Sequence, residues 1–174
     1  MHVFGLAGWS GSGKTTLMTR LLPALIQRGV SVSTIKHAHH AFDVDQPGKD
    51  SYRHREAGAT EVMVSSENRW ALMHELRGNT EPALEQLLRY MSPVDLVIVE
   101  GFKRASLPKL EVYRAVVGKP LLAPADSDII AVASDLPVAG LGELPRFALD
   151  DVGAIAGFII AHLRIAAAGR GAAQ

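Results

Sequence analysis

A glycine-rich octapeptide near the amino terminus constrains the fold of this chain more than any other feature. Residues 8–15 read Gly-Trp-Ser-Gly-Ser-Gly-Lys-Thr, which matches the pattern G-x-x-x-x-G-K-[ST] at every fixed position. The apolar run Val3–Ala7 precedes the octapeptide and predicts a strand, and Lys14–Arg28 follows it with leucines at helical spacing. A strand, a glycine loop and a helix in this order are typical of a phosphate-binding loop.

The residue types of this loop each have a role in holding a phosphate chain. Glycines let backbone N–H groups turn toward phosphate oxygens, and the helix N-terminus adds partial positive charge. Lys14 supplies an ammonium group and is a candidate catalytic residue, while Thr15 offers a hydroxyl to Mg²⁺. Trp9 fits packing or an interface as well as a nucleotide contact, and Thr16 fits either the α-phosphate or helix packing. The predicted nucleotide-binding residues of the loop are Gly8, Ser10, Gly11, Ser12, Gly13, Lys14, Thr15 and Thr16.

Strand and helix patterns alternate along the rest of the chain. The run Leu96–Val99 is uninterrupted and apolar, as expected where both faces of a parallel sheet are covered. We predict one α/β domain over residues 1–168, a three-layer P-loop NTPase fold with a mainly parallel sheet, and a disordered tail over 169–174. The other predicted strands are Val30–Ile35, Thr60–Ser65, Arg69–Leu76, Lys109–Val117 and Asp128–Ala133, and the other predicted helices are Asp50–Ala57, Thr80–Tyr90 (with Thr80 as N-cap) and Asp150–Ala168.

An acidic residue stands at each end of the apolar strand, and geometry favours the second. Ligands of open parallel sheets bind beyond the carboxyl ends of the strands, and five residues at roughly 3.3 Å each separate Asp95 from Glu100 by about 16 Å. We predict that Glu100 is a catalytic residue that contacts Mg²⁺ or water in the outer sphere. Gly101 is predicted to let the backbone approach the γ-phosphate, whereas Asp95 is expected to be structural.

The polar segment Lys36–Lys49 leaves the second predicted strand at the sheet edge that carries the phosphate loop. Asp45 is our candidate Mg²⁺ ligand, with Asp50 as the alternative, and Lys36 and Lys49 are placed to offset phosphate charge. For each of them a solvated position in the loop is the alternative interpretation.

The same segment and the helix after it contain further candidates. His37, His39 and His40 have the side chains of a transition-metal site, although polar loop positions explain three histidines equally well. Arg53 and Arg55 fit surface salt bridges or a contact with a phosphate or a partner.

Recognition of the base is predicted from the end of a later strand. Asp135 follows Asp128–Ala133, and its carboxylate can accept hydrogen bonds from N1 and N2 of guanine. Adenine would gain nothing from a carboxylate at that edge, which favours GTP. Capping of a turn before Pro137 is the alternative role.

Composition narrows the classes of partner. Lys plus Arg and Asp plus Glu both total 18, so the net charge is zero and no uniform basic surface for nucleic acid is expected. The chain has no cysteine, which excludes thiolate metal sites and disulfides and suits the reducing cytoplasm. Its most apolar late segment is too short for a membrane span, and no signal peptide is expected.

With these motifs, the chain resembles the MobB-type molybdopterin-guanine dinucleotide biosynthesis adapter proteins, a family of P-loop GTP-binding proteins. The resemblance implies a homodimer that binds GTP with Mg²⁺, hydrolyses it weakly and assists the MobA-type nucleotidyltransferase that joins GMP to molybdopterin. It leaves open whether molybdopterin contacts this chain. The segments that carry the resemblance are Gly8–Thr16, Thr34–His40, Asp45–Ser51 with Arg53, Ala57–Ala59 and Val99–Lys103.

Two other functions share some of the same residues. A small-molecule P-loop kinase would use the same loop in a domain of this size, and a metallochaperone-type GTPase would use the three histidines. The sequence offers positioning groups for phosphates but no secure general base and no assured arginine finger, which favours slow turnover.

Overall fold

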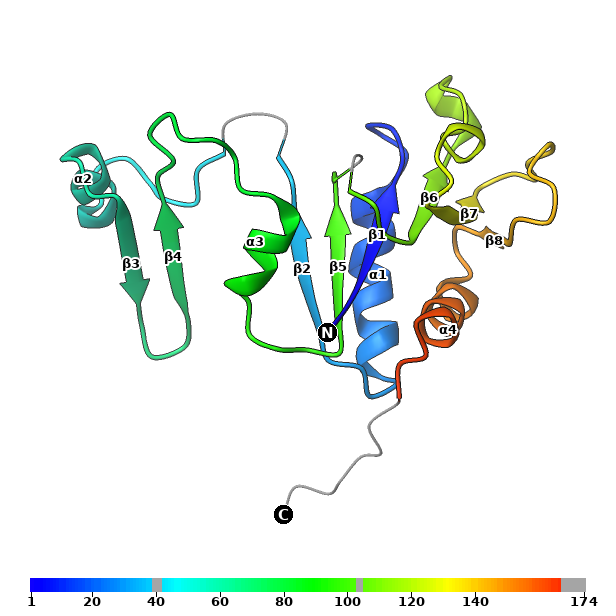
Figure 1. The fold of residues 1–174 in the computed structure, drawn as a ribbon, viewed down its shortest axis with the longest axis horizontal. Helices are drawn as coiled ribbons and strands as arrows, with labels where there is room; N and C mark the ends of the chain where they lie inside the picture. Colours follow the sequence, from blue (N-terminus) through cyan, green and yellow to red (C-terminus); the bar gives the residue numbers. More distant parts are fainter. Residues whose placement is uncertain (39–41, 103–104, 167–174) are drawn as a thin grey trace, which may run out of the picture. The chain divides into compact units, whose positions relative to one another are not determined.

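The computed structural model describes residues 1–38, 42–102 and 105–166, which form two compact units (Figure 1). The larger unit comprises Met1–His37 and the chain from Ser92 onward, and the smaller unit comprises Ala38–Met91.

Within the described residues, the larger unit holds one parallel sheet of six strands in the order β2-β5-β1-β6-β7-β8 (Figure 1). The prediction of an α/β fold with a mainly parallel sheet is therefore confirmed. Strand β1 lies between β5 and β6, so the glycine-rich loop leaves the sheet from an inner strand. The strands are β1 (His2–Ala7), β2 (Val32–Lys36), β5 (Leu96–Glu100), β6 (Lys109–Tyr113), β7 (Ile129–Ser134) and β8 (Arg146–Ala148).

Burial follows the apolar pattern of the strands. All four residues of Leu96–Val99 in β5 are at most 2% exposed, as expected for a strand covered on both faces. Helices α1 (Lys14–Ile26) and α4 (Val152–Leu163) pack against each other and share one core with the sheet, in which Phe4, Leu21 and Ile159 are fully buried. Among the described residues, none of the helices combines the length and the apolar composition of a membrane span.

The ends of the elements differ from the sequence prediction for local reasons. Helix α4 begins after Asp151, whose side chain accepts a hydrogen bond from the Ala154 N–H at 3.0 Å, and Arg164 ends it with a left-handed φ of 54°. The predicted strand Lys109–Val117 ends at Tyr113, because η1 (Ala115–Val117) begins a 3₁₀ turn there. Strand β8 and η2 (Ala123–Ala125) were not predicted, since three residues give no readable periodicity.

The smaller unit contains α2 (Asp50–Glu56), the antiparallel pair β3 (Glu61–Ser65) and β4 (Trp70–His74), and α3 (Leu84–Arg89). Both predicted strands are confirmed, and the paired residues Met63 and Leu72 remain exposed. The predicted N-cap at Thr80 is wrong. The helix starts after Ala83, whose N–H donates to Gln86 Oε1 at 2.9 Å.

Two buried charged residues of β6 hold the segment that follows it. Lys109 is 3% exposed and its Nζ lies 3.0 Å from Asp126 Oδ2 and 3.6 Å from Asp128 Oδ2. Glu111 is fully buried, and its two carboxylate oxygens accept the N–H groups of Leu122 and Ala123 at 2.8 Å each. The chain between β6 and β7 is therefore fixed to the sheet by charge-assisted hydrogen bonds.

We expect Glu111 to make the stability of the protein depend on pH. Burial raises the pKa of Glu111 above its ordinary value of 4.5, against the lowering effect of the Leu122 and Ala123 N–H groups. The folded state then binds the proton more tightly than the unfolded state. The contribution of Glu111 to the free energy of unfolding is therefore full below pH 4.5 and is lost as the pH rises through the folded-state pKa.

Glu111→Gln removes this titration. The free energy of unfolding of the wild type minus that of the variant should decrease as the pH rises above 4.5, as measured by urea denaturation. A difference that increases with pH would show that the two hydrogen bonds outweigh burial.

Candidate functional site

The glycine-rich loop connects β1 to α1 as the motif requires. Gly8, Gly11 and Gly13 have φ angles of 139°, 80° and 95°, which side-chain-bearing residues adopt only at a cost. Gly13 occupies the N-cap position of α1 in the left-handed region, so the helix N-terminus opens directly from the loop. The predicted residues Gly8–Thr16 therefore form the loop and the first turn of the helix that follows it.

Gly8 is required by a close contact as well as by its φ angle. A Cβ atom there would collide with the carbonyl oxygen of Val112 in β6 and would lie 2.7 Å from Ser12 Oγ. Ser12 is 2% exposed, and its buried Oγ has no hydrogen-bond partner among the described residues. A buried hydroxyl of this kind is available to an acceptor that enters the loop.

Lys14 and Trp9 have defined contacts in the structure. Lys14 Nζ donates to the carbonyl oxygens of Gly8 and Trp9, both at 2.9 Å, so its ammonium group lies over the loop. Trp9 Nε1 donates to Pro120 O at 2.7 Å, and Lys119 Nζ is 5.9 Å from the indole centroid. Of the roles considered for Trp9, the structure thus supports packing, which joins the loop to the segment after β6.

Glu100 and Asp95 lie where the strand geometry predicted. Glu100 is the last residue of β5 and pairs in register with Leu6 of β1 and Lys36 of β2, at the sheet edge from which the loop emerges. Asp95 is at the opposite edge, where its Oδ2 accepts hydrogen bonds from the N–H and Oγ of Ser31 at 2.8 and 2.6 Å. These bonds lower the pKa of Asp95 and confirm its structural role.

The structure gives Gly101 a packing reason. Its φ is 97°, and a Cβ would lie 2.9 Å from His37 O and 3.0 Å from His37 Cβ. The His37 ring is 5.2 Å from the Phe102 ring, so His37 contributes to packing at this point. His39, His40 and Lys103 lie outside the described residues. Within the described part of the chain, no three His, Asp or Glu side chains are grouped to hold a metal ion.

A cavity of about 260 Å³ adjoins the first turn of α1, near the lower limit for small-molecule sites. Asp135, the predicted base-reading residue, follows β7 and lines this cavity together with Thr16. Ser134 shapes the turn there by donating from Oγ to Leu136 O at 2.7 Å. The lining residues are Gly13, Thr16, Leu17, Arg20, Arg114, Ser134, Asp135, Ala148, Leu149 and Asp150.

Three charged residues of the cavity were missed from the sequence. Arg114 directly follows β6, and Asp150 follows β8 after one intervening residue. The predicted strand Lys109–Val117 contained Arg114, so the rule that ligands bind beyond the carboxyl ends of strands did not indicate it. Arg20 comes from the second turn of α1 and donates to Asp150 O at 3.1 Å. Its place depends on β8, which is too short to predict.

The family model for molybdopterin guanine dinucleotide synthesis protein B, MobB, matches residues 3–135. This chain belongs to the MobB family. The molybdopterin-guanine dinucleotide biosynthesis adapter protein of Escherichia coli is 43% identical over 161 residues, which cover 91% of each chain. The adapter protein of Haemophilus influenzae is 42% identical over 150 residues, 85% of this chain and 80% of that protein.

Solved structures agree with this family. A crystal structure of molybdopterin-guanine biosynthesis protein B is 31% identical with a TM-score of 0.73 and covers 92% of this chain and 99% of that one. A MobB homologue from Bacillus stearothermophilus is 26% identical with a TM-score of 0.70, over 94% and 99% of the two chains. MobB family membership assigns the chain to molybdopterin guanine dinucleotide biosynthesis.

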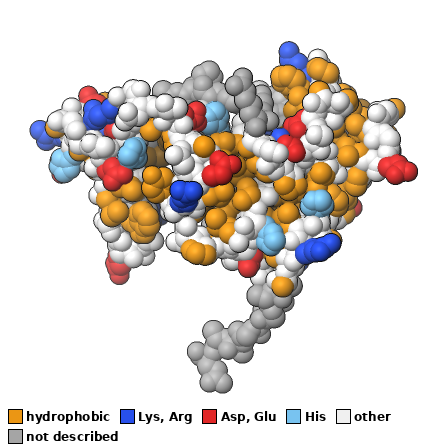
Figure 2. All heavy atoms as spheres, in the orientation of Figure 1, with side chains coloured by type: hydrophobic (Ala, Val, Ile, Leu, Met, Phe, Trp, Pro, Cys, Tyr) orange, Lys and Arg blue, Asp and Glu red, His pale blue; other side chains and the backbone are white. Residues whose placement is uncertain are grey.

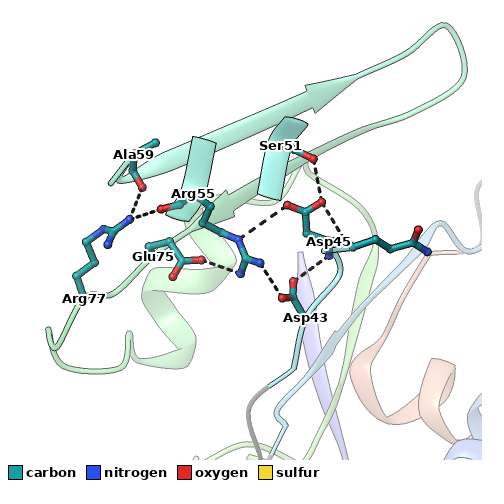
Figure 3. A network of polar contacts seen from close by, with 8 residues as sticks. Asp43, Asp45, Ser51, Arg55, Ala59, Glu75 and Arg77 are labelled. Atoms are coloured by element: carbon teal, nitrogen blue, oxygen red, sulfur yellow. Dashed lines mark hydrogen bonds and ion pairs between the residues drawn. The ribbon is translucent and has the colours of Figure 1, made fainter. Parts of the chain in front are cut away.

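The smaller unit of this MobB-family chain contains a network of charges around Arg55 (Figure 3). The guanidinium of Arg55 contacts Asp43 Oδ2 at 2.7 Å, Glu75 Oε1 at 3.3 Å and Asp45 Oδ2 at 3.9 Å. Arg77 Nη2 donates to the carbonyl oxygens of Arg55 and Ala59 at 2.9 Å each. For Arg55, the structure supports the salt-bridge interpretation.

Asp45, the predicted Mg²⁺ ligand, has structural partners inside this network. Its Oδ1 accepts hydrogen bonds from Ser51 Oγ at 2.8 Å and from the Gln46 N–H at 3.0 Å. The hydrogen bond from Arg55 lowers the pKa of the neighbouring Asp43 carboxyl group. Asp45, Lys49, Asp50 and Arg53 all belong to the smaller unit, and their roles toward a nucleotide stay predictions.

The close contact at Gly8 leads to a test of loop geometry. We expect Gly8→Ala to lower the free energy of unfolding by roughly 2–5 kcal/mol, because it adds a collision with Val112 O to an unfavourable φ. Gly11→Ala is the matched control, since its φ is also positive but nothing lies within 4 Å of its Cβ position. It should cost about 1–2 kcal/mol in urea denaturation. Equal losses in the two variants would contradict the close packing of the loop on β6.

Proposed function

We propose that this chain is a GTP-binding adapter that assists the attachment of GMP to molybdopterin in molybdopterin guanine dinucleotide biosynthesis. The observation that carries the proposal is the cavity lined by Asp135 beside the first turn of the phosphate loop's helix. Phosphates bound in the loop and a base bound in the cavity would belong to one nucleotide. The E. coli and H. influenzae relatives carry the adapter name, which supports the same biosynthetic role here.

The choice of guanine follows from the chemistry of the Asp135 carboxylate. Guanine presents N1–H and N2–H₂ donors on one edge, and an ionised carboxylate has two oxygens to accept them. Adenine has no donor at N1 and no amino group at C2, so the same carboxylate would face an acceptor. An unmatched charge in a partly closed site is unfavourable, and GTP is therefore preferred over ATP.

The loop and the end of β5 fit a magnesium nucleotide. The positive φ angles of Gly8, Gly11 and Gly13 let the loop backbone curve, and the Ser12 hydroxyl inside it lacks a partner among the described residues. We assign Mg²⁺ to the Thr15 hydroxyl, with Glu100 in its outer sphere. Bound Mg²⁺ neutralises phosphate charge and orients water. Lys14 would hold the phosphate chain and Glu100 would orient the attacking water, an arrangement that gives weak hydrolysis at most.

The proposed partners come from the family. The adapter would act on the MobA-type nucleotidyltransferase in the cytoplasm, a location that the cysteine-free composition favours. It would do so as a homodimer, and the exposed apolar residues Met63, Trp70 and Leu72 of the smaller unit are compatible with a protein interface. Lys and Arg side chains are dispersed among Asp and Glu on the face in Figure 2, in keeping with protein and nucleotide partners rather than nucleic acid.

Replacement of Asp135 tests the preference for guanine. We expect Asp135→Asn to weaken GTP binding by roughly 10- to 100-fold, because it removes the charge and replaces one of the two acceptor oxygens by an NH₂ group that faces a donor of guanine. ATP binding should strengthen, because the substitution removes the charge that faces the N1 acceptor of adenine, as measured by calorimetric titration with Mg²⁺. Asp150→Asn is the matched control, since it changes another carboxylate that lines the cavity. Equal GTP and ATP affinities in the wild type would contradict the assignment of guanine.

Replacement of Lys14 tests whether nucleotide binding serves the adapter role. Lys14→Ala should weaken GTP binding by at least roughly 100-fold through loss of the ammonium–phosphate contacts. It should also abolish the stimulation of GMP transfer to molybdopterin by the purified nucleotidyltransferase. Arg28→Ala removes one positive charge at the opposite end of α1 and should leave both properties intact. If a Lys14→Ala protein that binds no GTP still stimulated the transfer of GMP fully, the adapter role would not depend on nucleotide binding.

A further inference from the structure

Arg114 lies against the phosphate loop although it is 100 residues away from it in the sequence. It follows the last residue of β6, and its own backbone is extended, with φ −136° and ψ 123°. A Cβ built on Gly13 would be 3.3 Å from Arg114 Nε and 3.5 Å from Nη2. The guanidinium therefore packs closely on the backbone at the start of α1.

The chain on both sides of Arg114 is fixed to the same loop. Two residues before it, the carbonyl oxygen of Val112 contacts Gly8 so closely that a methyl group would not fit. Six residues after it, Pro120 O accepts the hydrogen bond from Trp9 Nε1 at 2.7 Å. Glu111 holds the next turn through Leu122 and Ala123. Arg114 is thus held in place by contacts at both ends of its segment.

The guanidinium has a donor left over. Arg114 Nε is buried and has no hydrogen-bond partner within the part of the chain that the structure describes. A buried cationic donor without an acceptor is unfavourable, so a site that keeps one is suited to a ligand that supplies the acceptor. The planar guanidinium matches the oxygens of a phosphate group, which it can bind through two parallel hydrogen bonds.

We propose that Arg114 binds the phosphate chain of the nucleotide at its nucleoside end, at the α- and β-phosphates. This inference rests on the nucleotide site proposed above and adds a residue to it. Arg114 lines the cavity together with Thr16 and Asp135, so it lies on the side of the loop where the base is assigned. The contact would be equal for a diphosphate and a triphosphate and absent for a nucleoside.

Arginine at the α- and β-phosphates acts on affinity rather than on the chemical step. Charge that develops during hydrolysis lies on the γ-phosphate and on the oxygen that bridges it to the β-phosphate, and an arginine finger stabilises it by contacting those atoms. A cation at the nucleoside end instead keeps both substrate and product bound. Arg114 should therefore change the affinity for GDP as much as that for GTP and leave the rate of hydrolysis at saturation nearly constant.

The test uses Arg114→Ala and Arg114→Lys in the full chain, with GTP, GDP and guanosine as the probes and Mg²⁺ present. We expect Arg114→Ala to weaken GTP and GDP alike by roughly 10- to 100-fold and guanosine by less than about twofold. Arg114→Lys should show a smaller loss, since it keeps the charge but not the planar fork. Arg28→Ala is the control for charge, because it removes an exposed arginine outside the cavity.

Several results would overturn the inference. The first is a GTP affinity of Arg114→Ala equal to that of the wild type. The second is a loss of guanosine affinity as large as the loss of GTP affinity. The third is a loss of affinity confined to GTP, together with a lower rate of GTP hydrolysis at saturation. Urea denaturation without nucleotide will reveal whether Arg114→Ala folds. If it does not, the test uses Arg114→Lys, whose loss of affinity should be equal for GTP and GDP and smaller for guanosine.

The two proposals can fail separately. A wild type that prefers ATP would refute the guanine assignment alone, and Arg114 would then be judged on ATP, ADP and adenosine. A wild type that binds neither triphosphate would refute both.

Discussion

The contact between the phosphate loop and strand β6 is the constraint on which the rest of the site depends. Gly8 meets the carbonyl oxygen of Val112 so closely that the loop can take this path only where no side chain is present. From that point β6 continues into Arg114 beside Gly13, and the following segment returns to the loop at Pro120. The contact between Gly8 and Val112 therefore aligns the loop with the cavity. It also brings the guanidinium of Arg114, which comes from outside the loop, beside Gly13.

Charge inside the larger unit supports this alignment. Glu111 and Lys109 are nearly inaccessible to solvent, yet both have partners in the segment between β6 and β7. Burying such groups is unfavourable unless each has its hydrogen bonds, so the segment has little freedom to move away from β6. The electrostatic arrangement of the interior thus positions the residues at the surface that would contact the nucleotide.

The parts of the site that sequence predicts are local in the chain. The octapeptide 8–15 directly follows its strand and contains the turn and the helix start, and Glu100 follows from the length of one apolar strand. Arg114 and Arg20 depend instead on which strand lies beside which, and on the three-residue strand β8 that no periodicity reveals. Asp45 shows a further difficulty, because a carboxylate in a polar loop serves a metal or a structural network equally well by sequence, and here it accepts hydrogen bonds from Ser51 and Gln46.

The central claim is that a guanine nucleotide spans the loop and the cavity. The most direct measurement is a crystal structure of the full chain with Mg²⁺ and a non-hydrolysable GTP analogue. We expect its phosphates within the loop 8–16, its guanine edge hydrogen-bonded to Asp135, and the guanidinium of Arg114 on the α- or β-phosphate. A nucleotide whose phosphates occupy the loop while its base lies away from Asp135 and outside this cavity would contradict the account.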